Sequence, residues 1–564
     1  MLKLHLTKHL FAGTMALSLA AMTASAAQAT VQAIGAALPD ILSNEKVMKD
    51  KFLPDYSFAG YANSEKAPST QDFTVINVAD HGIFANDGLD DSQALLTLLD
   101  NLRESDEPTV LQFSKGRYII SSIIYFDRNN LVVRGEGSGA SGTEFYFPRP
   151  LIYTEAPELK ELKEYLVSLN KIQKEKKNNI YLPFTEWAWS GGYFWTRIKD
   201  LRVKKYLDKY DVPIRTLATP SKGTQGGFIL TVDTSDKLKV GEIIELQWYN
   251  TKGENAPIIN ELYHGLVDNV GSHHWRFANL ALARQQSEIV AINGNQVELK
   301  TPLLHNIHEG MEVNLAPWEH LSNIGFEHFT MTFPFAERIA HHVEQGFNGI
   351  YLTRLYNGWV DDVKITNADS GILTEEVANI SITDVVTDGE KFAHYSVQMG
   401  AVHNVLVENL QVKNKVEHPL SFNTFATKSV YLRSSIDIDP VLDQHSGVNQ
   451  QNLFDMISVN VTLDENRQYP LFAGGGASYW KPSHAAYNTF WNINVRFQNG
   501  HASAQSVLLN GMKDGPKARV ISVNGNVPVH VEYGPDAYIE GTNWVYPEAE
   551  SLFEYQLKKR LSQE

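Results

Sequence analysis

Three histidines recur through the middle of the chain, each at a similar distance from the start of a short apolar strand pattern. His394, His418 and His445 lie 13 to 15 residues after such a start. The pKa of a free imidazole lies near neutral pH, so histidine can remove or donate a proton in a reaction. If the strands stack about 4.8 Å apart, the three side chains form a column on one face. The spacing therefore predicts an acid–base wall.

Charged, hydroxyl and amide side chains surround these histidines and extend the candidate site. Glu376 extends the column by one coil at nearly the same phase. The predicted catalytic residues are His394, Tyr395, His418, His445, Arg433, Glu417 and Asp443. The predicted substrate-binding residues are Lys391, Glu376, Gln444, Asn423, Trp187, Trp189 and Trp195.

This set suits β-elimination at a uronate sugar. The reaction neutralises a carboxylate, removes the proton at C5 and protonates the glycosidic oxygen as it leaves. In this hypothesis the histidines line the scissile bond and Tyr395 is the acid. Arg433 or Lys391 holds the carboxylate, and arginine is better suited to a bidentate contact. The predicted substrate is an acidic polysaccharide, with the sugar and the linkage left open.

Other functions fit the same residues. Hydrolysis requires a pair of carboxylates on neighbouring coils. The candidates for such pairs are Glu417, Asp443, Glu376 and Asp388. A glycan-binding protein without turnover is a second alternative, and histidines stacked inside a turn without chemistry are a third.

Metal binding is a further alternative. Stacked histidine and glutamate can ligate zinc or calcium, but side chains in a ladder diverge and no HxH or HExxH spacing occurs. We therefore predict no metal and no other cofactor, with calcium possible but not indicated.

The elements that must position these residues repeat along the chain. Each repeat alternates apolar and polar residues and ends in a turn-forming or polar residue, and the starts of the repeats are 17, 25 and 25 residues apart. Such units build a solenoid of parallel β coils, because one coil cannot bury its own apolar face. The repeats are Val363–Asn367, Ile380–Asp384, Val405–Asn409 and Val430–Ser434.

An earlier stretch matches the start of such a solenoid. Its motifs, in order, are Asn77–Gly82, Asn86–Ser92, Leu111–Tyr118 and Leu131–Gly137. They resemble the opening of secreted pectate-lyase-superfamily proteins that degrade polysaccharides. The resemblance implies an all-β fold, a right-handed parallel β-helix, with a capping helix after the aspartate-rich turn. It makes Asp90 and Asp91 structural residues of that cap. The ordered motif set of polygalacturonases is absent, so the exact family is not placed.

The remaining segments give the domain organisation. Residues 1–29 are predicted to be a signal peptide, and 30–200 an N-terminal arm, a capping helix and first coils with a helical excursion. Residues 201–318 alternate and carry an Asn-Gly turn, which predicts an inserted antiparallel, barrel-like module. The main β-helix is expected over 319–540 and a C-terminal capping helix over 541–564. The aromatic cluster with Trp187, Trp189 and Trp195 is either edge packing or a sugar-stacking platform.

Charge and composition limit the partners. The net charge is −16, which argues against a nucleic-acid or anionic-membrane binder. The apolar run of the signal peptide is too short to span a membrane. Cleavage near Ala26 or Ala29 predicts a secreted or periplasmic protein, and we expect a monomer. The chain has no cysteine, so its stability must come from its core.

Overall fold

The computed structural model describes residues 33–172, 184–201, 214–253, 256–267, 278–445, 447–475, 482–499, 505–511 and 515–563. The predicted signal peptide, residues 1–29, lies outside these ranges. Within the described ranges, no helix combines the length and the apolar character needed to cross a bilayer.

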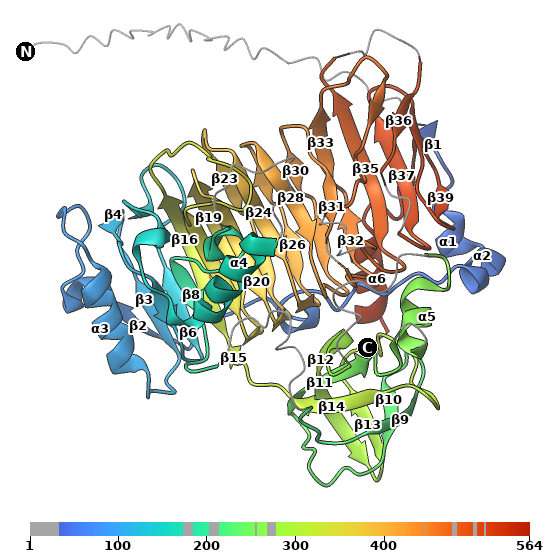
Figure 1. Cartoon of the computed structure of the whole chain (residues 1–564), viewed down its shortest axis with the longest axis horizontal. Coiled ribbons are helices and arrows are strands. Elements are labelled where there is room, and N and C mark those ends of the chain that lie inside the picture. Colours follow the sequence, from blue (N-terminus) through green and yellow to red (C-terminus); the bar gives the residue numbers. More distant parts are fainter. Residues whose placement is uncertain are drawn as a thin grey trace, which may run out of the picture.

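The chain winds into a right-handed parallel β-helix, which confirms the predicted fold (Figure 1). Successive coils add strands to three faces. The first face holds β2 (Thr74–Asn77), β3 (Thr109–Gln112), β6 (Leu131–Arg134), β16 (Ile324–Thr332), β19 (Trp359–Thr366), β22 (Ser381–Thr383), β26 (Leu406–Glu408), β29 (Val430–Leu432), β32 (Leu453–Asp455), β35 (Thr489–Phe497), β37 (Arg519–Gly525) and β39 (Tyr538–Glu540).

The second face continues from the ends of β16, β19 and β35. Its own strands are β4 (Gly116–Ile119), β7 (Thr143–Tyr146), β23 (Val386–Asp388), β27 (Gln411–Val412), β30 (Ser435–Ile436) and β33 (Ser458–Val461). The third face is a seven-stranded parallel sheet of β5 (Ile124–Phe126), β8 (Phe194–Thr196), β17 (Asn348–Thr353), β20 (Ser370–Glu375), β24 (Ala393–Met399), β28 (Val416–Phe422) and β31 (Leu442–Gln444).

Short parallel pairs complete the coils. They are β15 (Leu321–Ser322), β18 (Leu355–Tyr356), β21 (Val377–Ala378) and β25 (Val402–His403), then β34 (Gln468–Tyr469), β36 (Val507–Leu509) and β38 (Val529–Val531), and finally β1 (Ala33–Ile34) with β40 (Trp544–Val545).

The repeat length is real, but the predicted register is only partly right. Ile382 pairs with Val407, as the repeats predict. Val407 then pairs with Tyr431, one residue before the expected Leu432, and the partner of Ile382 in the preceding coil is Val360. The corners between faces differ in length by one or a few residues. Residues that are equally spaced along the chain therefore do not always pair with each other in the sheet.

Asparagine marks the corners for a physical reason. Asn357, Asn379 and Asn404 have φ of 54°, 55° and 54°, and each lies two residues before a strand of the first face. Asparagine adopts this left-handed conformation more readily than other residues with a side chain. Inside the coils, apolar side chains stack in line, as in the nearly parallel rings of Phe454 and Phe490, 5.2 Å apart. The corners turn the chain, and the stacks fill the core.

The described helices lie at the ends of the solenoid, along its side and in the inserted module. They are α1 (Asp40–Ser43), α2 (Glu45–Asp50), α3 (Ser92–Leu102), α4 (Lys160–Ile172), α5 (Pro257–Tyr263) and α6 (Leu552–Leu561). The predicted capping helix is α3, which begins where Asp90 accepts the backbone N–H of Ser92 at 2.9 Å. Figure 1 shows α3 at the first coils, with α1 and α2 at the opposite end. From the central coils onward, the N-terminal arm and α6 share an apolar cluster with strands of the first face.

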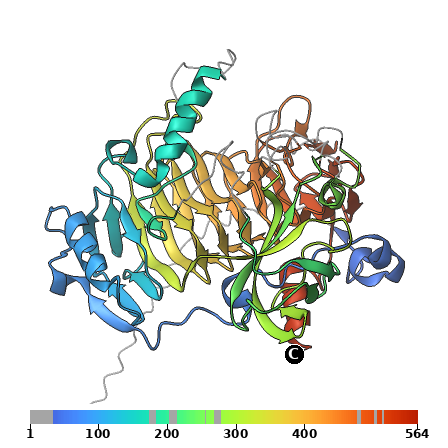
Figure 2. The same cartoon turned by 60° about the horizontal axis from the view of Figure 1, so that its bottom comes forward.

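The predicted antiparallel insertion is present. Its sheet has the order β14-β11-β12-β13-β10-β9. The strands are β9 (Pro220–Gly223), β10 (Ile229–Val232), β11 (Ile243–Tyr249), β12 (Ala281–Asn293), β13 (Gln296–Leu299) and β14 (Val313–Pro317). The Asn293–Gly294 pair lies at the β12–β13 hairpin, as expected. Figure 2 shows the module beside the coils, and its core includes Phe425 and Val448 from them.

Candidate active site

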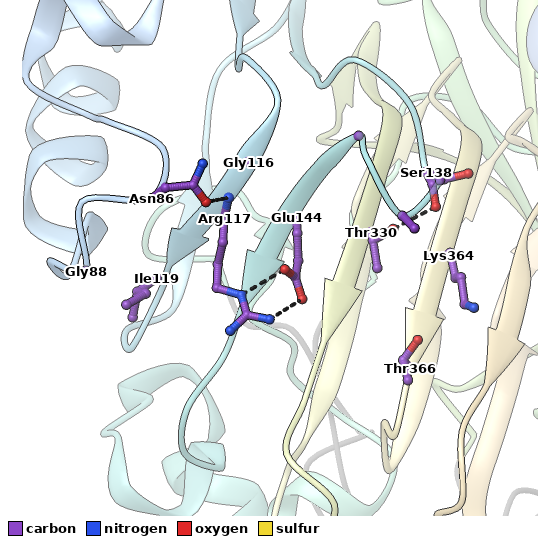
Figure 3. A pocket seen from close by; sticks show the side chains of 13 residues that line it. Asn86, Gly88, Gly116, Arg117, Ile119, Ser138, Glu144, Thr330, Lys364 and Thr366 are labelled. Carbon is purple, nitrogen blue, oxygen red and sulfur yellow. Dashed lines mark hydrogen bonds and ion pairs between the residues drawn. The ribbon is translucent and has the colours of Figure 1, made fainter.

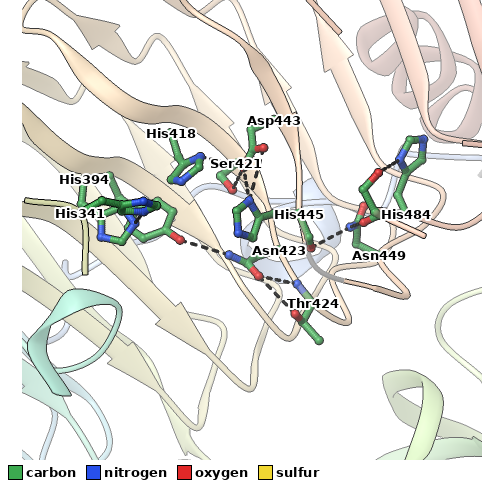
Figure 4. Close-up of polar contacts among 12 residues, drawn as sticks. His341, His394, His418, Ser421, Asn423, Thr424, Asp443, His445, Asn449 and His484 are labelled. Atoms are coloured by element: carbon green, nitrogen blue, oxygen red, sulfur yellow. Dashed lines mark hydrogen bonds and ion pairs between the residues drawn. The ribbon is translucent and has the colours of Figure 1, made fainter. Parts of the chain in front are cut away.

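The three predicted histidines meet on the third face (Figure 4). His394 belongs to β24 and His418 to β28, and His445 follows β31. The ring centres of His394 and His418 are 5.4 Å apart, and those of His418 and His445 are 4.7 Å apart. Residues from three coils therefore form one imidazole cluster.

The prediction that the three histidines occupy nearly the same position in successive coils is wrong. His418 lies opposite Tyr395 in the sheet, and Asp443 lies opposite Ser421. Strand β24 is irregular at this point, because the N–H groups of His394 and Tyr395 both donate to the carbonyl oxygen of Asp369. The rings converge because the backbone bends there and because the side chains reach across the coils.

Asp443 lies between two of the imidazoles. Its Oδ2 is 3.3 Å from Nδ1 of His418 and 3.1 Å from Nδ1 of His445, and it accepts the Ser421 hydroxyl at 2.7 Å. Burial opposes ionisation of this carboxyl, but His445 and His418 outweigh burial and hold the pKa of Asp443 well below its usual range. An ionised Asp443 requires protonated Nδ1 atoms on its partners, which leaves each Nε2 for proton transfer.

A second group of residues joins the cluster from the segment between β16 and β17. His341 contributes Nε2 at 3.1 Å from Nε2 of His394, and the ring of His342 is 5.6 Å from that of His394. Buried Glu344 places Oε1 3.3 Å from Nδ1 of His394. Burial raises the pKa of Glu344 to about 8 and, with His341 close by, lowers that of His394. Sequence reasoning missed these residues, although the His341-His342 doublet is a visible signal.

Tyr395 and Glu417 lie beside the histidines, as predicted. The Tyr395 ring stacks on His394, with centres 4.2 Å apart, and its hydroxyl accepts the amide of Asn423 at 3.4 Å. Glu417 accepts Nη1 of Arg338 at 2.9 Å. Burial raises and the Arg338 hydrogen bond lowers the pKa of Glu417, and the net shift is downward. Arg338 was not among the predicted residues. It nevertheless places a guanidinium beside the histidines, where the hypothesis requires one to hold the substrate carboxylate.

Two predicted binding residues are buried nearby. Lys391 pairs with Asp369 at 2.7 Å, and its ammonium lies over the ring of Phe347. Gln444 is fully buried. Both side chains are buried beneath the histidine cluster, where a polysaccharide cannot reach them.

Arg433 and Glu376 are not brought to the histidines, so their predicted placement is wrong. Arg433 lies at a corner of the first face and pairs with Glu408 and with Glu554 of α6. Glu376 pairs with Arg284 of the inserted module and with Arg354. Counting residues from a strand start placed Glu376 on the third face, whereas Arg433 directly follows β29 of the first face.

The tryptophans divide into two groups. Trp187 and Trp195 are 1% and 0% exposed and pack in the core, so the prediction of a sugar-stacking platform is wrong for these two. Trp189 is partly buried, and its ring meets His342 edge-on with centres 5.1 Å apart. Among the three, Trp189 alone lies against the histidine cluster and keeps an open part.

A separate hollow of about 810 Å³ lies on the second face near the first coils (Figure 3). Arg117 holds Glu144 with two contacts at its centre, and Lys364 and Thr366 line its far side. None of the predicted site residues lines it, so it is distinct from the histidine wall.

Comparison with known proteins places the chain in no family. No family model matches it, and no curated protein matches it. Among solved structures, the tailspike protein gp49 from Pseudomonas phage LKA1 is 11% identical over 83% of this chain and 79% of its own, with a TM-score of 0.40. DFA-IIIase from Arthrobacter chlorophenolicus A6, without its lid, is 11% identical over 83% of this chain and 93% of its own, with a TM-score of 0.38. Function must therefore be derived from the site itself.

Proposed function

We propose that the protein is a secreted enzyme that cleaves an acidic, uronate-containing polysaccharide by β-elimination. The carrying observation is the single ionised carboxylate, Asp443, that meets Nδ1 of both His418 and His445. Such a carboxylate fixes the tautomer and the orientation of an imidazole, as in other acid–base sites. The secreted location rests on the predicted signal peptide.

His445 is the proposed base, because its side chain is 13% exposed and its Nδ1 is held by Asp443. Its Nε2 takes the C5 proton, the C4–O bond breaks, and a C4–C5 double bond forms. The Tyr395 hydroxyl returns a proton to the leaving oxygen, and the His418 ring lies between this acid and the base His445. These groups lie together, since the rings of Tyr395 and His418 are 5.2 Å apart.

Arg338 takes the role that was predicted for Arg433. Its guanidinium pairs with partly exposed Glu417 in this structure. A substrate carboxylate that displaces Glu417 gains a charge-assisted hydrogen bond. Neutralising that carboxylate makes the C5 proton more acidic.

The four carboxyls predicted for hydrolysis form no acid–base pair, and the one raised-pKa carboxyl of the cluster, Glu344, is buried behind His394. Hydrolysis by a carboxylate pair needs one protonated acid. The pKa values of Glu417 and Asp443 are both lowered, so both are ionised at neutral pH. The other proposed partners, Glu376 and Asp388, are paired elsewhere with Arg354 and Lys364.

The test is a panel of alginate, pectate, ulvan, carrageenan and glycosaminoglycans. Each digest is followed by ultraviolet absorbance and by reducing ends. Elimination produces an unsaturated uronate that absorbs, so both signals should rise together on at least one uronate-containing substrate. Reducing ends without absorbance would assign hydrolysis. Binding to a glycan without either signal would assign a glycan-binding protein.

A further inference from the structure

We propose that His341, His342 and His394 form a binding site for a divalent transition metal of the zinc class. One ligand nitrogen from each of the three lies within 4.8 Å of the other two. Imidazole nitrogens suit zinc, copper, nickel and iron, and three of them with one open position form a common zinc site. This inference stands independently of the polysaccharide reaction.

The distance between two of the nitrogens already fits a metal. Nε2 of His341 and Nε2 of His394 are 3.1 Å apart. A tetrahedral ion with Zn–N bonds of about 2.0–2.1 Å separates its nitrogens by about 3.3 Å. The nitrogen of His342 lies within 4.8 Å of the other two, so it needs to approach by at most about 1.5 Å to complete the set. The His341-His342 doublet comes from a connecting segment, so the divergence expected of a ladder of strand side chains does not apply to it.

The surroundings of His394 match those of a metal ligand. A ligating histidine usually gives its other ring N–H to a carboxylate, which fixes the ring. Here Oε1 of Glu344 accepts the backbone N–H of His342 at 3.2 Å and lies 3.3 Å from Nδ1 of His394, an ion-pair contact that becomes a hydrogen bond when the ring turns. Glu344 is itself buried, so a cation nearby would stabilise its charged form. One carboxylate therefore holds the backbone of His342 and lies within reach of the His394 ring.

The site has an entry path and a mixed charge. His341 is exposed, which leaves the fourth coordination position open to water or to an oxygen of a ligand. The charges that face the cluster are Glu344 and Glu417, both acidic, and Arg338, which is basic. The nearby group of His418, Asp443 and His445 is a competing site. We favour the first group, because Asp443 already engages Nδ1 of both histidines in the second.

The test uses the full mature chain stripped with a chelator and titrated with Zn²⁺ by calorimetry. Co²⁺ absorption spectra provide a second readout of imidazole coordination. We expect one Zn²⁺ per chain. The double variant His341→Ala/His342→Ala should bind at least about 100-fold more weakly, and Glu344→Gln about 10- to 100-fold more weakly.

His445→Ala is the matched control, because it removes a histidine of the competing group only, and it should keep the wild-type affinity. The thermal midpoints of all variants are compared without metal to establish that they fold. Zn²⁺ should raise the midpoint of the wild type and of His445→Ala but not that of the double variant. Absence of stoichiometric binding by the wild type, equal affinity in the double variant, or loss only in His445→Ala would overturn the assignment.

Discussion

Asp443 and Asp455 are buried carboxylates of one coil, on two different faces, and they behave in opposite ways. Asp443, on β31 of the third face, meets the imidazoles of His418 and His445. Asp455, on β32 of the first face, meets only neutral donors from the start of α6, the hydroxyl of Ser551 at 2.7 Å and the N–H of Phe553 at 2.9 Å. Burial raises the pKa of Asp455 to about 7, whereas the histidines hold that of Asp443 low.

The difference shows that burial alone does not mark a reactive carboxylate. Asp455 holds a helix in place and is stable as a neutral acid. Asp443 stays charged at neutral pH, because each imidazole that it contacts supplies a proton donor. The third face therefore keeps a buried carboxylate ionised next to two imidazoles, and Asp455 on the first face has no such partners. Substitutions on the two faces should separate these behaviours.

The largest effect is expected for Asp443→Asn. Loss of the anion leaves the two Nδ1 atoms without their shared acceptor, so the tautomers and orientations of His418 and His445 are no longer fixed. Turnover of the acidic polysaccharide should fall by about 10²- to 10⁴-fold, the usual contribution of a positioned acid–base group. Asp455→Asn is the matched control and should turn over at close to the wild-type rate. Equal losses in both variants would place the effect in the fold rather than in the site.

The same pair of residues predicts opposite pH dependences of stability. The folded pKa of Asp455, about 7, lies above its unfolded value of 3.8, so the folded state binds more protons between these values. Its contribution to the free energy of unfolding is present below pH 4 and is lost as the pH rises toward 7, by up to about 4 kcal/mol. For Asp443 the folded pKa is lowered, so its contribution is present above pH 4 and is lost below it.

Unfolding of wild type, Asp455→Asn and Asp443→Asn from pH 3 to 8 checks these signs. Asp455→Asn should flatten the slope between pH 4 and 7, and Asp443→Asn should change the slope only at the acid end. The reverse assignment of the two slopes would contradict the difference between the faces.

Removing the guanidinium should have a smaller effect. Arg338→Ala loses the charge proposed to hold the substrate carboxylate, and a hydrogen bond to a charged group contributes about 1.5–3 kcal/mol. We expect kcat/KM to fall by about 10- to 100-fold. Arg338→Lys should recover part of the loss, since it restores the charge without the bidentate geometry. Wild-type kinetics for Arg338→Ala on the best substrate would exclude Arg338 from the reaction.

The smallest effect is expected for Arg433→Ala. Its pairs with Glu408 and Glu554 are partly exposed, and such pairs contribute about 0.2–1 kcal/mol. The substitution should lower the free energy of unfolding by an amount of this order, while turnover stays unchanged. A loss of turnover comparable to that of Arg338→Ala would restore Arg433 to the site.

The fold was predictable from the sequence because its determinants are local and repeated. Apolar residues at alternate positions recur in the central coils, and asparagine occupies the same corner in three successive coils, so each of these repeats indicates the same structure. The register between strands of neighbouring coils was less predictable, because the turns between faces differ in length. Val407 therefore pairs with Tyr431 rather than with Leu432.

The residues of the candidate site differ in the same way: those on repeating strands were predictable, and those on a connecting segment were not. His394, His418 and Asp443 were found because they belong to the repeating strands. His341, His342 and Glu344 were missed because they belong to a connecting segment that has no period. Arg433 was misplaced because it follows a strand of the first face by one residue, where the chain turns outward.

The most direct test of the proposed reaction is the ultraviolet absorbance of an acidic polysaccharide digested by wild type and by His445→Ala at equal folded concentration. Absorbance should rise with wild type and stay near its starting value with the variant, because the variant lacks the base that removes the C5 proton. Equal rises in the two digests would contradict the assignment of His445 and the acid–base role of the third face.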